Sequence, residues 1–341
     1  MKPDKNQIEN KRRKEEAKKM EEIMKEYEKM SKEVERTPTK NDGRITPTTR
    51  KKYMSAHKMR RSPKFTYLHE DPTMRLHAEI MDFFEEHRPN KSQDEKRKEA
   101  CERIKRVIQK RWRECEVVVY GSYPSGTYLP DSDIDITIFL ESELPERELV
   151  YQLGNHLNQH AEKGRLKIIQ TLPFARVPII KLLDLKSLFQ IDISFNVSTC
   201  HRSVTFTRYL INIYPPLLPL LLVTKRFLQV HSLNEPFHGG LSSFSLLLLI
   251  VSFLQFHVGY NQSPKTVNLG SLLIDFFGVY ACFNFRVYGI SILNGGYYFY
   301  KPTSIFYSQS QPEIPVIVDP LAQACNATRS TYAIRTMYLS F

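Results

Sequence analysis

The chain has 341 residues and a mass of 40.0 kDa, so one large domain or two interlocked domains are expected. Hydrophobic residues make up 41% and charged residues 25%, a composition that excludes collagen-like and wholly disordered chains. The net charge of +12 lies almost entirely at one end: residues 1–64 carry 21 Lys and Arg against 11 Asp and Glu, whereas the remainder carries 28 against 26.

The cysteines and the apolar stretches restrict the class of protein further. The five cysteines are scattered and form no Cys-x-x-Cys pair, which argues against a disulfide framework or a zinc site. The first residues contain no apolar segment typical of a signal peptide. The most apolar stretch, 241–254, is interrupted by serines and is shorter than the roughly 20 residues of a membrane span. We therefore expect no membrane attachment, a buried helix over 241–254, and a cytosolic or nuclear protein.

Residues 1–64 predict a basic tail rather than a packed domain. The Lys/Glu-rich run 11–36 can form a charged helix with little to bury, and the Thr-, Pro- and Lys/Arg-rich run 37–64 predicts disorder. Two interpretations are open. The tail is either a tether that attracts nucleic-acid phosphates by counterion release, or a spacer that carries a nuclear-import signal in KMRRSPK.

From residue 65 onward the apolar residues are spaced as in helices, and predicted strands follow these helices. Apolar residues after Asp71-Pro72 predict a helix up to about residue 87, and Ala100, Ile104 and Ile108 mark one face of a charged helix over 92–111. The next segments predict strands at CEVVVY, IDITIFL, KIIQTLPF, VPIIKLLD and LFQIDISFNV, with an amphipathic helix at ELPERELVYQLGNHLNQHA.

Strand signals fade after about residue 199. Three apolar helices are predicted at PLLPLLLVTKRFLQV, LSSFSLLLLIVSFLQFHV and NLGSLLIDFFGVYACF, followed by a loop and a short closing helix. The order helical, mixed α/β, helical indicates an α/β catalytic unit that lies between helical segments.

Asp133 and Asp135 lie at the start of the predicted strand in PDSDIDITIF. Side chains two positions apart on a strand share a face, so both carboxylates point the same way, while Ile134 and Ile136 face the opposite side. Carboxylates this close repel each other unless cations lie between them, and oxygen ligands are what Mg²⁺ prefers. Asp131 and Asp133 form an alternative pair; we favour Asp133 and Asp135 and assign Asp131 a turn or capping role.

A phosphate-binding turn and a third carboxylate extend this pair. Gly121 and Ser122 follow the strand VVVY, and a turn there directs N–H groups and a hydroxyl at one spot, which suits phosphate oxygens. Asp192 lies within the otherwise apolar strand QIDISF, where burial without a cation would be costly. The arrangement predicts phosphoryl or nucleotidyl transfer, with Asp192 completing the site for the metal that activates the attacking hydroxyl.

The segment GSYPSGTYLPDSDIDITIF resembles the signature of the DNA polymerase β-like nucleotidyltransferases. More narrowly, further segments resemble the noncanonical poly(A) polymerases of the TRAMP type. These segments are FTYLHEDPTMRLHAEIMDFF, VPIIKLLD, QIDISFNV, LVTKRFLQ, LNEPFHGGLSSFSL, NLGSLLIDFF and DPLAQACNATRSTY. The resemblance runs from about residue 65 to the end. It implies an α/β plus all-α fold: a nucleotidyltransferase catalytic domain with a mixed sheet over 81–198, and a helical central domain built from 65–80 and 199–341.

The resemblance also implies roles for matched residues. Asp133, Asp135 and Asp192 would hold Mg²⁺ or Mn²⁺. The ATP triphosphate would be bound by Gly121, Ser122, Lys225 and Ser243. The base would stack on Phe244, and the terminal loop with Asn326 and Arg329 would recognise the nucleotide.

The residues alone leave some of these roles open. Lys225 in an apolar helix either faces a triphosphate or extends to the surface. Phe244 also fits core packing, and Ser242 and Ser243 also fit helix N-caps.

Two segments depart from the family pattern. Thr199-Cys200 stands where relatives usually carry the Asn-Gly that contacts ribose. Residues 325–330 read CNATRS where relatives commonly read Asn-Asp-Val-Gly-Arg-Ser. Uridylyltransferases tend to have His at the position of Cys325, so the resemblance favours ATP over UTP.

The function implied is template-independent transfer of AMP from ATP to RNA 3′ ends, in RNA surveillance or processing in the nucleus or, alternatively, the cytoplasm. The family also implies a zinc-knuckle RNA-binding partner, a helicase and the exosome. Two rivals stay open: a terminal uridylyltransferase, and a catalytically silent RNA-binding scaffold. Three converging acids argue against the scaffold, because an inactive copy has no need of them.

Overall fold

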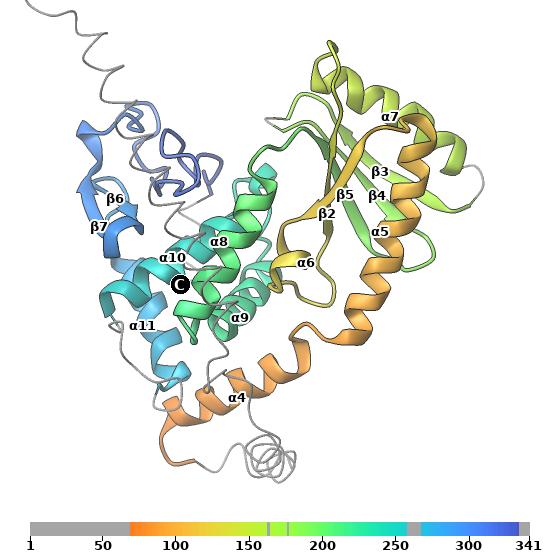
Figure 1. The fold of residues 1–341 in the computed structure, drawn as a ribbon. Coiled ribbons are helices and arrows are strands. Elements are labelled where there is room, and N and C mark those ends of the chain that lie inside the picture. The colour runs from red at the N-terminus through yellow and green to blue at the C-terminus, as the bar shows by residue number, and fades with distance from the viewer. Residues whose placement is uncertain (1–68, 162–163, 176, 258–266, 334–341) are drawn as a thin grey trace, which may run out of the picture. The chain divides into compact units, whose positions relative to one another are not determined.

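The structure of the protein is a computed structural model that describes residues 69–161, 164–175, 177–257 and 267–333 (Figure 1). The predicted basic tail over 1–64 lies outside these residues. Residues from Tyr67 onward form one compact unit.

Two helices open the described chain, as predicted. Helix α4 (Pro72–His87) begins after Asp71, whose carboxylate accepts a hydrogen bond from the Thr73 N–H at 2.8 Å. Helix α5 (Lys91–Arg111) begins after Asn90, whose side chain accepts from the Gln93 N–H.

A five-stranded mixed sheet follows, with strand order β1-β2-β5-β4-β3. Its strands β2 and β5 are parallel and the other neighbours are antiparallel. The short helix α6 (Ser122–Ser125) connects β1 to β2, and α7 (Glu146–Ala161) connects β2 to β3. The strands are β1 (Glu116–Tyr120), β2 (Ile134–Phe139), β3 (Leu166–Leu172), β4 (Ile179–Asp184) and β5 (Gln190–Phe195). The predicted mixed sheet is confirmed.

Helices α5 and α7 pack against one face of the sheet and bury its apolar residues (Figure 1). Ile104 of α5, Leu153 of α7, Ile136 of β2 and Ile193 of β5 belong to this cluster and are at most 2% exposed. Because side chains alternate along a strand, the polar residues between these isoleucines lie on the opposite face.

Four helices follow the sheet: α8 (Cys200–Ile213), α9 (Leu217–Val230), α10 (Ser243–His257) and α11 (Leu269–Cys282). The last three were predicted, and α10 is a buried core helix as expected. Helix α8 was not predicted, because only a few apolar residues such as Phe206 and Leu210 mark its buried face. Among the described residues no single helix is long and apolar enough to cross a membrane; only α8 and α9 together, bent by 116°, reach that length and hydropathy.

The prediction that strands end near residue 199 is wrong. Strands β6 (Tyr288–Ser291) and β7 (Tyr297–Tyr300) form a second, two-stranded antiparallel sheet. Each strand has only four residues, and YYFY shows no alternation of apolar and polar side chains, so periodicity could not reveal the pair. Short 3₁₀ turns η1 (Pro236–His238), η2 (Leu293–Gly295) and η3 (Lys301–Thr303) complete the fold.

A second apolar cluster is formed mainly by the helices. It joins Ile80 of α4 with buried residues of α8 to α11 and with Ile317 and Leu321 near the end of the chain. The first helix therefore packs with helices that lie far from it in sequence, while the segment between them builds the sheet. The exact domain boundaries at 80 and 198 stay a prediction.

Candidate active site

The register of the sheet brings two of the predicted carboxylates side by side. Asp135 of β2 and Asp192 of β5 are direct partners in the parallel pair. Lys181 of β4 is the partner of Asp192, and Tyr120 of β1 is the partner of Asp135, so these four side chains share one face of the sheet. Asp133 lies directly before β2. Asp135 and Asp192, 57 positions apart in the chain, are therefore neighbours in the sheet.

The turn after β1 approaches Asp135 so closely that only glycine fits. Gly121 has φ +74° and ψ −142°, in the left-handed region that favours glycine. A Cβ atom placed on it would lie 2.1 Å from Asp135 Oδ2. The Ser125 hydroxyl donates to the Gly121 carbonyl at 2.8 Å and fastens the turn. The predicted phosphate-binding turn thus lies directly against the carboxylates.

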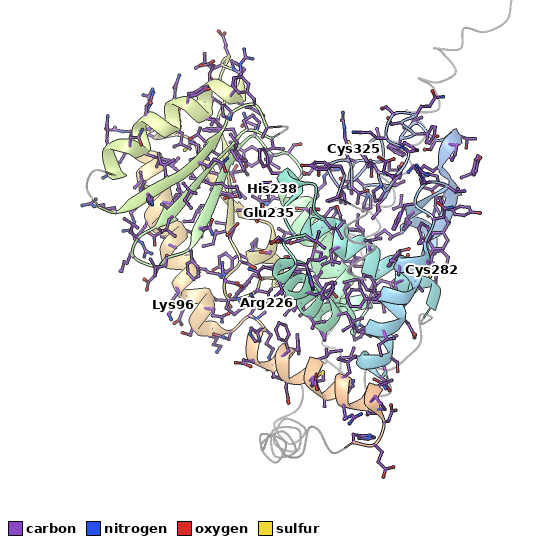
Figure 2. All side chains as sticks on the ribbon, turned by 180° about the vertical axis from the view of Figure 1, so that it is seen from behind. Lys96, Arg226, Glu235, His238, Cys282 and Cys325 are labelled. Atoms are coloured by element: carbon purple, nitrogen blue, oxygen red, sulfur yellow. The ribbon has the colours of Figure 1, made fainter. Side chains whose placement is uncertain are left out.

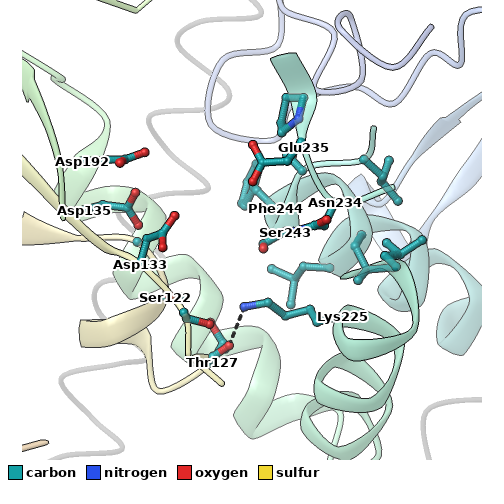
Figure 3. Close-up of a pocket in the computed structure, with 18 of the residues that line it drawn as sticks. Ser122, Thr127, Asp133, Asp135, Asp192, Lys225, Asn234, Glu235, Ser243 and Phe244 are labelled. Atoms are coloured by element: carbon teal, nitrogen blue, oxygen red, sulfur yellow. Dashed lines mark hydrogen bonds between the residues drawn. The ribbon is translucent and has the colours of Figure 1, made fainter. Parts of the chain in front are cut away.

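A cleft of about 1100 Å³ opens on this face of the sheet (Figure 3). One wall carries the phosphate-binding turn and the three aspartates, and the other is formed by α9, the loop 234–237 and the start of α10. Of the residues predicted from the sequence, those that line the cleft are Gly121, Ser122, Asp133, Asp135, Asp192, Lys225, Ser243, Phe244 and Arg329.

Burial raises the pKa values of all three aspartates, and repulsion between carboxylates adds to it at Asp135 and Asp133. Burial is the main cause for Asp135, whose pKa rises to about 7, with the charges of Asp192 and Asp133 adding to it. Burial and the charge of Asp192 raise the pKa of Asp133 to about 6. Burial also raises the pKa of Asp192, although Lys181 opposes this effect. Such a cluster attracts cations, because a cation removes the repulsion that the ionised carboxylates suffer.

The chemistry of these donors fits a divalent metal ion. Asp192 Oδ1 is buried and has no hydrogen-bond partner in the described part of the chain, although its Oδ2 pairs with Lys181 Nζ at 3.0 Å. Within the described residues no set of three His, Cys, Asp or Glu side chains converges closely enough to enclose a metal alone. Mg²⁺ in phosphate-handling sites takes one or two carboxylates and completes its shell with substrate phosphates and water, so the two observations agree.

Lys181 is a residue of this site that the sequence analysis missed. The ammonium group lies against Asp192, and the charge of Asp192 keeps the pKa of Lys181 above its ordinary value even though burial lowers it. The signal was available: Lys181 interrupts the apolar run VPIIKLLD at a position between two buried residues, Ile180 and Leu182.

The α9 wall supplies the predicted cation. The Lys225 ammonium donates to the Thr127 carbonyl at 2.9 Å and lies beside Ser122 (Figure 3). Burial lowers the pKa of Lys225 to about 8, against the opposing effect of Asp135. Of the two readings left open, the structure therefore has this lysine in the cleft rather than extended to the surface.

Three consecutive residues at the start of α10, Ser242, Ser243 and Phe244, have different surroundings. Ser242 is the residue whose hydroxyl accepts from the Ser245 N–H at 3.0 Å, which is the N-cap contact. Ser243 is exposed in the cleft, and Phe244 rests against the helical cluster while it also lines the cleft. Phe244 thus combines both readings left open by the sequence.

The two predicted residues of the terminal loop, Asn326 and Arg329, differ in where they lie. Arg329 lines the cleft, but Asn326 does not. Its side-chain oxygen accepts from the Ile317 and Thr328 N–H groups at 3.0 Å, and its Nδ2 donates to the Pro315 carbonyl at 2.9 Å. The carboxamide of Asn326 is thus used to fold the loop itself, so its predicted contact with the nucleotide has no support in this geometry.

Two further charged residues complete the surroundings, and the sequence analysis named neither. Glu235 lies on the wall opposite the aspartates, and its charge adds to the effect of burial on the pKa values of Asp133 and Asp192 (Figure 3). Arg97 of α5 is fully buried behind the site. Glu235 lies within the segment LNEPFHGGLSSFSL that resembles the family, but the relation of both residues to the cleft depends on tertiary contacts.

Comparison with known proteins agrees with this geometry. Two family models match the chain: "Poly(A) RNA polymerase, mitochondrial-like, central palm domain" over residues 76–211, and "Cid1 family poly A polymerase" over residues 268–323. The solved polymerase core of TRAMP, an RNA surveillance complex, superposes with a TM-score of 0.70 at 31% identity, covering 79% of this chain and 84% of that chain.

Curated relatives are longer than this chain. The poly(A) RNA polymerase cid14 of Schizosaccharomyces pombe is 30% identical over 271 residues, covering 78% of this chain and 39% of cid14. Trf4-2 of Drosophila melanogaster, named an inactive poly(A) RNA polymerase protein, is 32% identical over 265 residues, covering 76% of this chain and 64% of Trf4-2. The chain spans between 35% and 43% of the length of the first curated relatives.

The superposition with the solved core covers most of both chains, at an identity that shows common ancestry. The chain therefore belongs to the noncanonical poly(A) polymerases of the TRAMP type, within the DNA polymerase β-like nucleotidyltransferases.

Proposed function

We propose that this protein transfers AMP from ATP to the 3′-hydroxyl of RNA without a template. The hydroxyl attacks the α-phosphate, the bond from the α-phosphorus to the bridging oxygen breaks, and pyrophosphate leaves. The observation that supports this most directly is the register of Asp135 and Asp192, paired across β2 and β5 beneath the Gly121 turn.

Each part of the cleft has a role in this proposal. Asp133, Asp135 and Asp192 hold divalent ions, Mg²⁺ or Mn²⁺, which when bound lower the pKa of the attacking hydroxyl and neutralise charge on the leaving group. Gly121 and Ser122 orient the triphosphate through backbone N–H groups and a hydroxyl.

The helical wall holds the rest of the nucleotide. In this proposal Lys225 and Ser243 offset and bind the phosphate charge, and Phe244 stacks on the base; all three line the cleft. Arg329 of the terminal loop also lines the cleft, and we propose that it contacts the nucleotide.

The biological setting is proposed from the family. TRAMP is an RNA surveillance complex, so we propose RNA 3′ ends as substrate and surveillance or processing in the nucleus as the setting, with the cytoplasm as the alternative. A zinc-knuckle RNA-binding protein, a helicase and the exosome are the proposed partners. Pull-down from nuclear extract, followed by mass spectrometry, tests them.

The test of the activity is incubation of the purified protein with an oligo-RNA, Mg²⁺ and each NTP separately. We expect extension with ATP, and none by an Asp135→Ala variant that still folds and binds the same RNA. Extension by that variant at the wild-type rate would contradict the proposal.

The same assay separates the rivals. A clear preference for UTP in direct competition identifies a uridylyltransferase. Binding of the RNA without extension by any NTP identifies a silent scaffold, a possibility that a relative named inactive makes concrete.

A further inference from the structure

The two walls of the cleft are joined through the segment 121–133, which connects β1 to β2. Basic side chains of α8 and α9 reach across to its backbone: Arg208 Nε donates to the Pro124 carbonyl at 2.9 Å, and Lys225 Nζ donates to the Thr127 carbonyl at 2.9 Å. The segment that carries the phosphate-binding turn and ends at Asp133 is therefore also the segment that the helices hold.

Asp131 makes the most extensive of these contacts. Arg226, labelled on α9 in Figure 2, donates from both terminal nitrogens to its carboxylate, at 2.9 and 3.1 Å. Gln229 Nε2 donates to it at 2.9 Å. Arg226 also donates to Gln229 Oε1 at 2.8 Å, so the three side chains form a closed network. We name this network of Asp131, Arg226 and Gln229 the clasp. A bidentate Arg–carboxylate pair in a network is the kind of surface ion pair that holds a defined geometry.

Asp131 is committed to α9 through these three hydrogen bonds from Arg226 and Gln229. This leaves Asp133 and Asp135 as the neighbouring pair that faces Asp192.

The segment that bears Asp131 is held firmly in place, so a shift of this segment also shifts the residues of the site. Arg97 is fully buried and donates to the carbonyls of Leu129, Pro130 and Ser132 at 3.1, 3.1 and 2.8 Å. Its guanidinium lies 4.3 Å from the ring centre of Tyr128 and 4.5 Å from that of Phe189. The residues directly before Asp133 are thus fixed to α5 on one side and to α9 on the other.

We propose that the clasp sets the separation of the two walls and thereby seats Lys225 against the phosphate-binding turn. Lys225 precedes Arg226 on α9, so the contact that fixes Arg226 also fixes where Lys225 lies. Asp131, Arg226 and Gln229 are positioning residues that act on nucleotide binding through Lys225. This inference rests on the proposed function for its kinetic readout, but its structural readout is independent of that function.

Loss of the clasp lowers the fraction of molecules in which the walls are at the binding distance. The apparent KM for ATP rises by the inverse of that fraction, whereas kcat, measured with the nucleotide bound, changes less. For a partly exposed bidentate network, reversal of one charge is expected to raise KM roughly 3- to 10-fold.

The experiment uses Asp131→Arg, Arg226→Asp and the double charge swap in the full chain. Steady-state tailing gives KM and kcat for ATP. Spin labels on cysteines introduced by Glu148→Cys in α7 and Ile274→Cys in α11, with Cys282→Ser and Cys325→Ser, report the distance between the two walls. We expect each single reversal to raise KM, broaden the distance distribution and leave kcat nearly unchanged, and the swap to restore both readouts.

Two further variants act as checks. Asp131→Asn keeps the shape of the side chain and removes its charge, and is expected to show the same changes at about a third of the size. Arg88→Glu reverses an arginine in the exposed pair with Glu85 on α4, at 2.8 Å, and is expected to change neither KM nor the distance.

Unchanged KM and unchanged distances in the single reversals, or a swap that restores neither, would overturn the inference. If none of the NTPs supports extension of RNA by the wild-type chain, the proposed function fails. The distance distributions of the same variants then still decide whether the clasp fixes the separation of the walls.

Discussion

Two aspartates in adjacent strands of one sheet have opposite surroundings. Asp184, at the end of β4, accepts from Arg103 Nε at 3.3 Å and Nη2 at 2.5 Å, and from the Ser187 N–H at 3.0 Å. Burial opposes them, but these contacts hold the pKa of Asp184 below its ordinary value. Asp192 has one partner, Lys181, and a buried oxygen with none among the described residues, and its pKa is raised.

The difference separates a carboxylate that stabilises the fold from one that is held ready for a ligand. A saturated buried aspartate contributes to folding, whereas an unsaturated one beside two further acids is a cost that a bound cation offsets. Perturbed, unsaturated groups of this kind gather at functional sites. The following predictions test this distinction, from the largest expected effect to the smallest.

Asp192→Asn should abolish transfer while the protein stays folded. Removal of a metal carboxylate costs several kcal/mol of transition-state stabilisation, so the single-turnover rate should fall about 1000-fold. The free energy of unfolding in urea should change by less than about 1 kcal/mol, because relief of the repulsion on Asp133 and Asp135 offsets the loss of the partly exposed ion pair with Lys181. A rate above about a tenth of the wild-type rate would remove Asp192 from the catalytic set.

Asp184→Asn should show the reverse. It leaves Arg103 without its ion-pair partner, and breaking a buried pair costs about 3 kcal/mol in the free energy of unfolding. Below its melting temperature the variant should keep a transfer rate close to that of the wild type. Urea unfolding and single-turnover tailing on the same sample measure both; a loss of rate without a loss of stability would contradict the distinction.

Gly121→Ala tests geometry without a change of charge. The new Cβ would meet Asp135 Oδ2 and would require φ +74°, so Asp135 must move. We expect a cost of about 2 kcal/mol in stability and a marked fall in the transfer rate. Gly126→Ala is the matched control, since that glycine also has φ +74° but no atom within 4 Å of its Cβ position. Equal loss of rate in both variants would show that backbone strain, not contact with Asp135, is responsible.

The smallest expected effect is on the pH dependence of stability, to which Asp135 and Asp133 contribute with one sign and Asp184 with the opposite sign. Asp135 and Asp133, with pKa values of about 7 and about 6, keep protons in the folded state that the unfolded chain has lost, so stability without metal falls as pH rises from about 5 to 8. Asp184, with its lowered pKa, acts oppositely and loses its contribution as pH falls through 4.

Urea unfolding between pH 5 and 8 without divalent ions measures this slope. Asp135→Asn should flatten it by about 1 kcal/mol per pH unit between pH 5 and 7, and Mg²⁺ should raise the melting temperature more at pH 8 than at pH 5.5. An identical slope in Asp135→Asn would show that Asp135 titrates normally.

Local patterns were sufficient for much of this fold. The spacing of Asp133 and Asp135 placed two carboxylates together, and the apolar strands and the helices α9 to α11 followed from periodicity. Helix α8 and the pair β6 and β7 escaped because their patterns are weak, and Asn326 was misplaced because resemblance of a loop does not reveal which way its side chains turn.

The sequence by itself determined which residues are unusual: acids within apolar strands, a glycine after a strand, and a lysine in an apolar helix. Only the tertiary structure decided what each one meets, because hydrogen bonds and ion pairs depend on register and packing between segments far apart in the chain. The sequence singled out Asp192 because it lies within an apolar strand, but only the structure showed that Asp184, at the end of β4, is paired with Arg103 while Asp192 lies beside two further carboxylates.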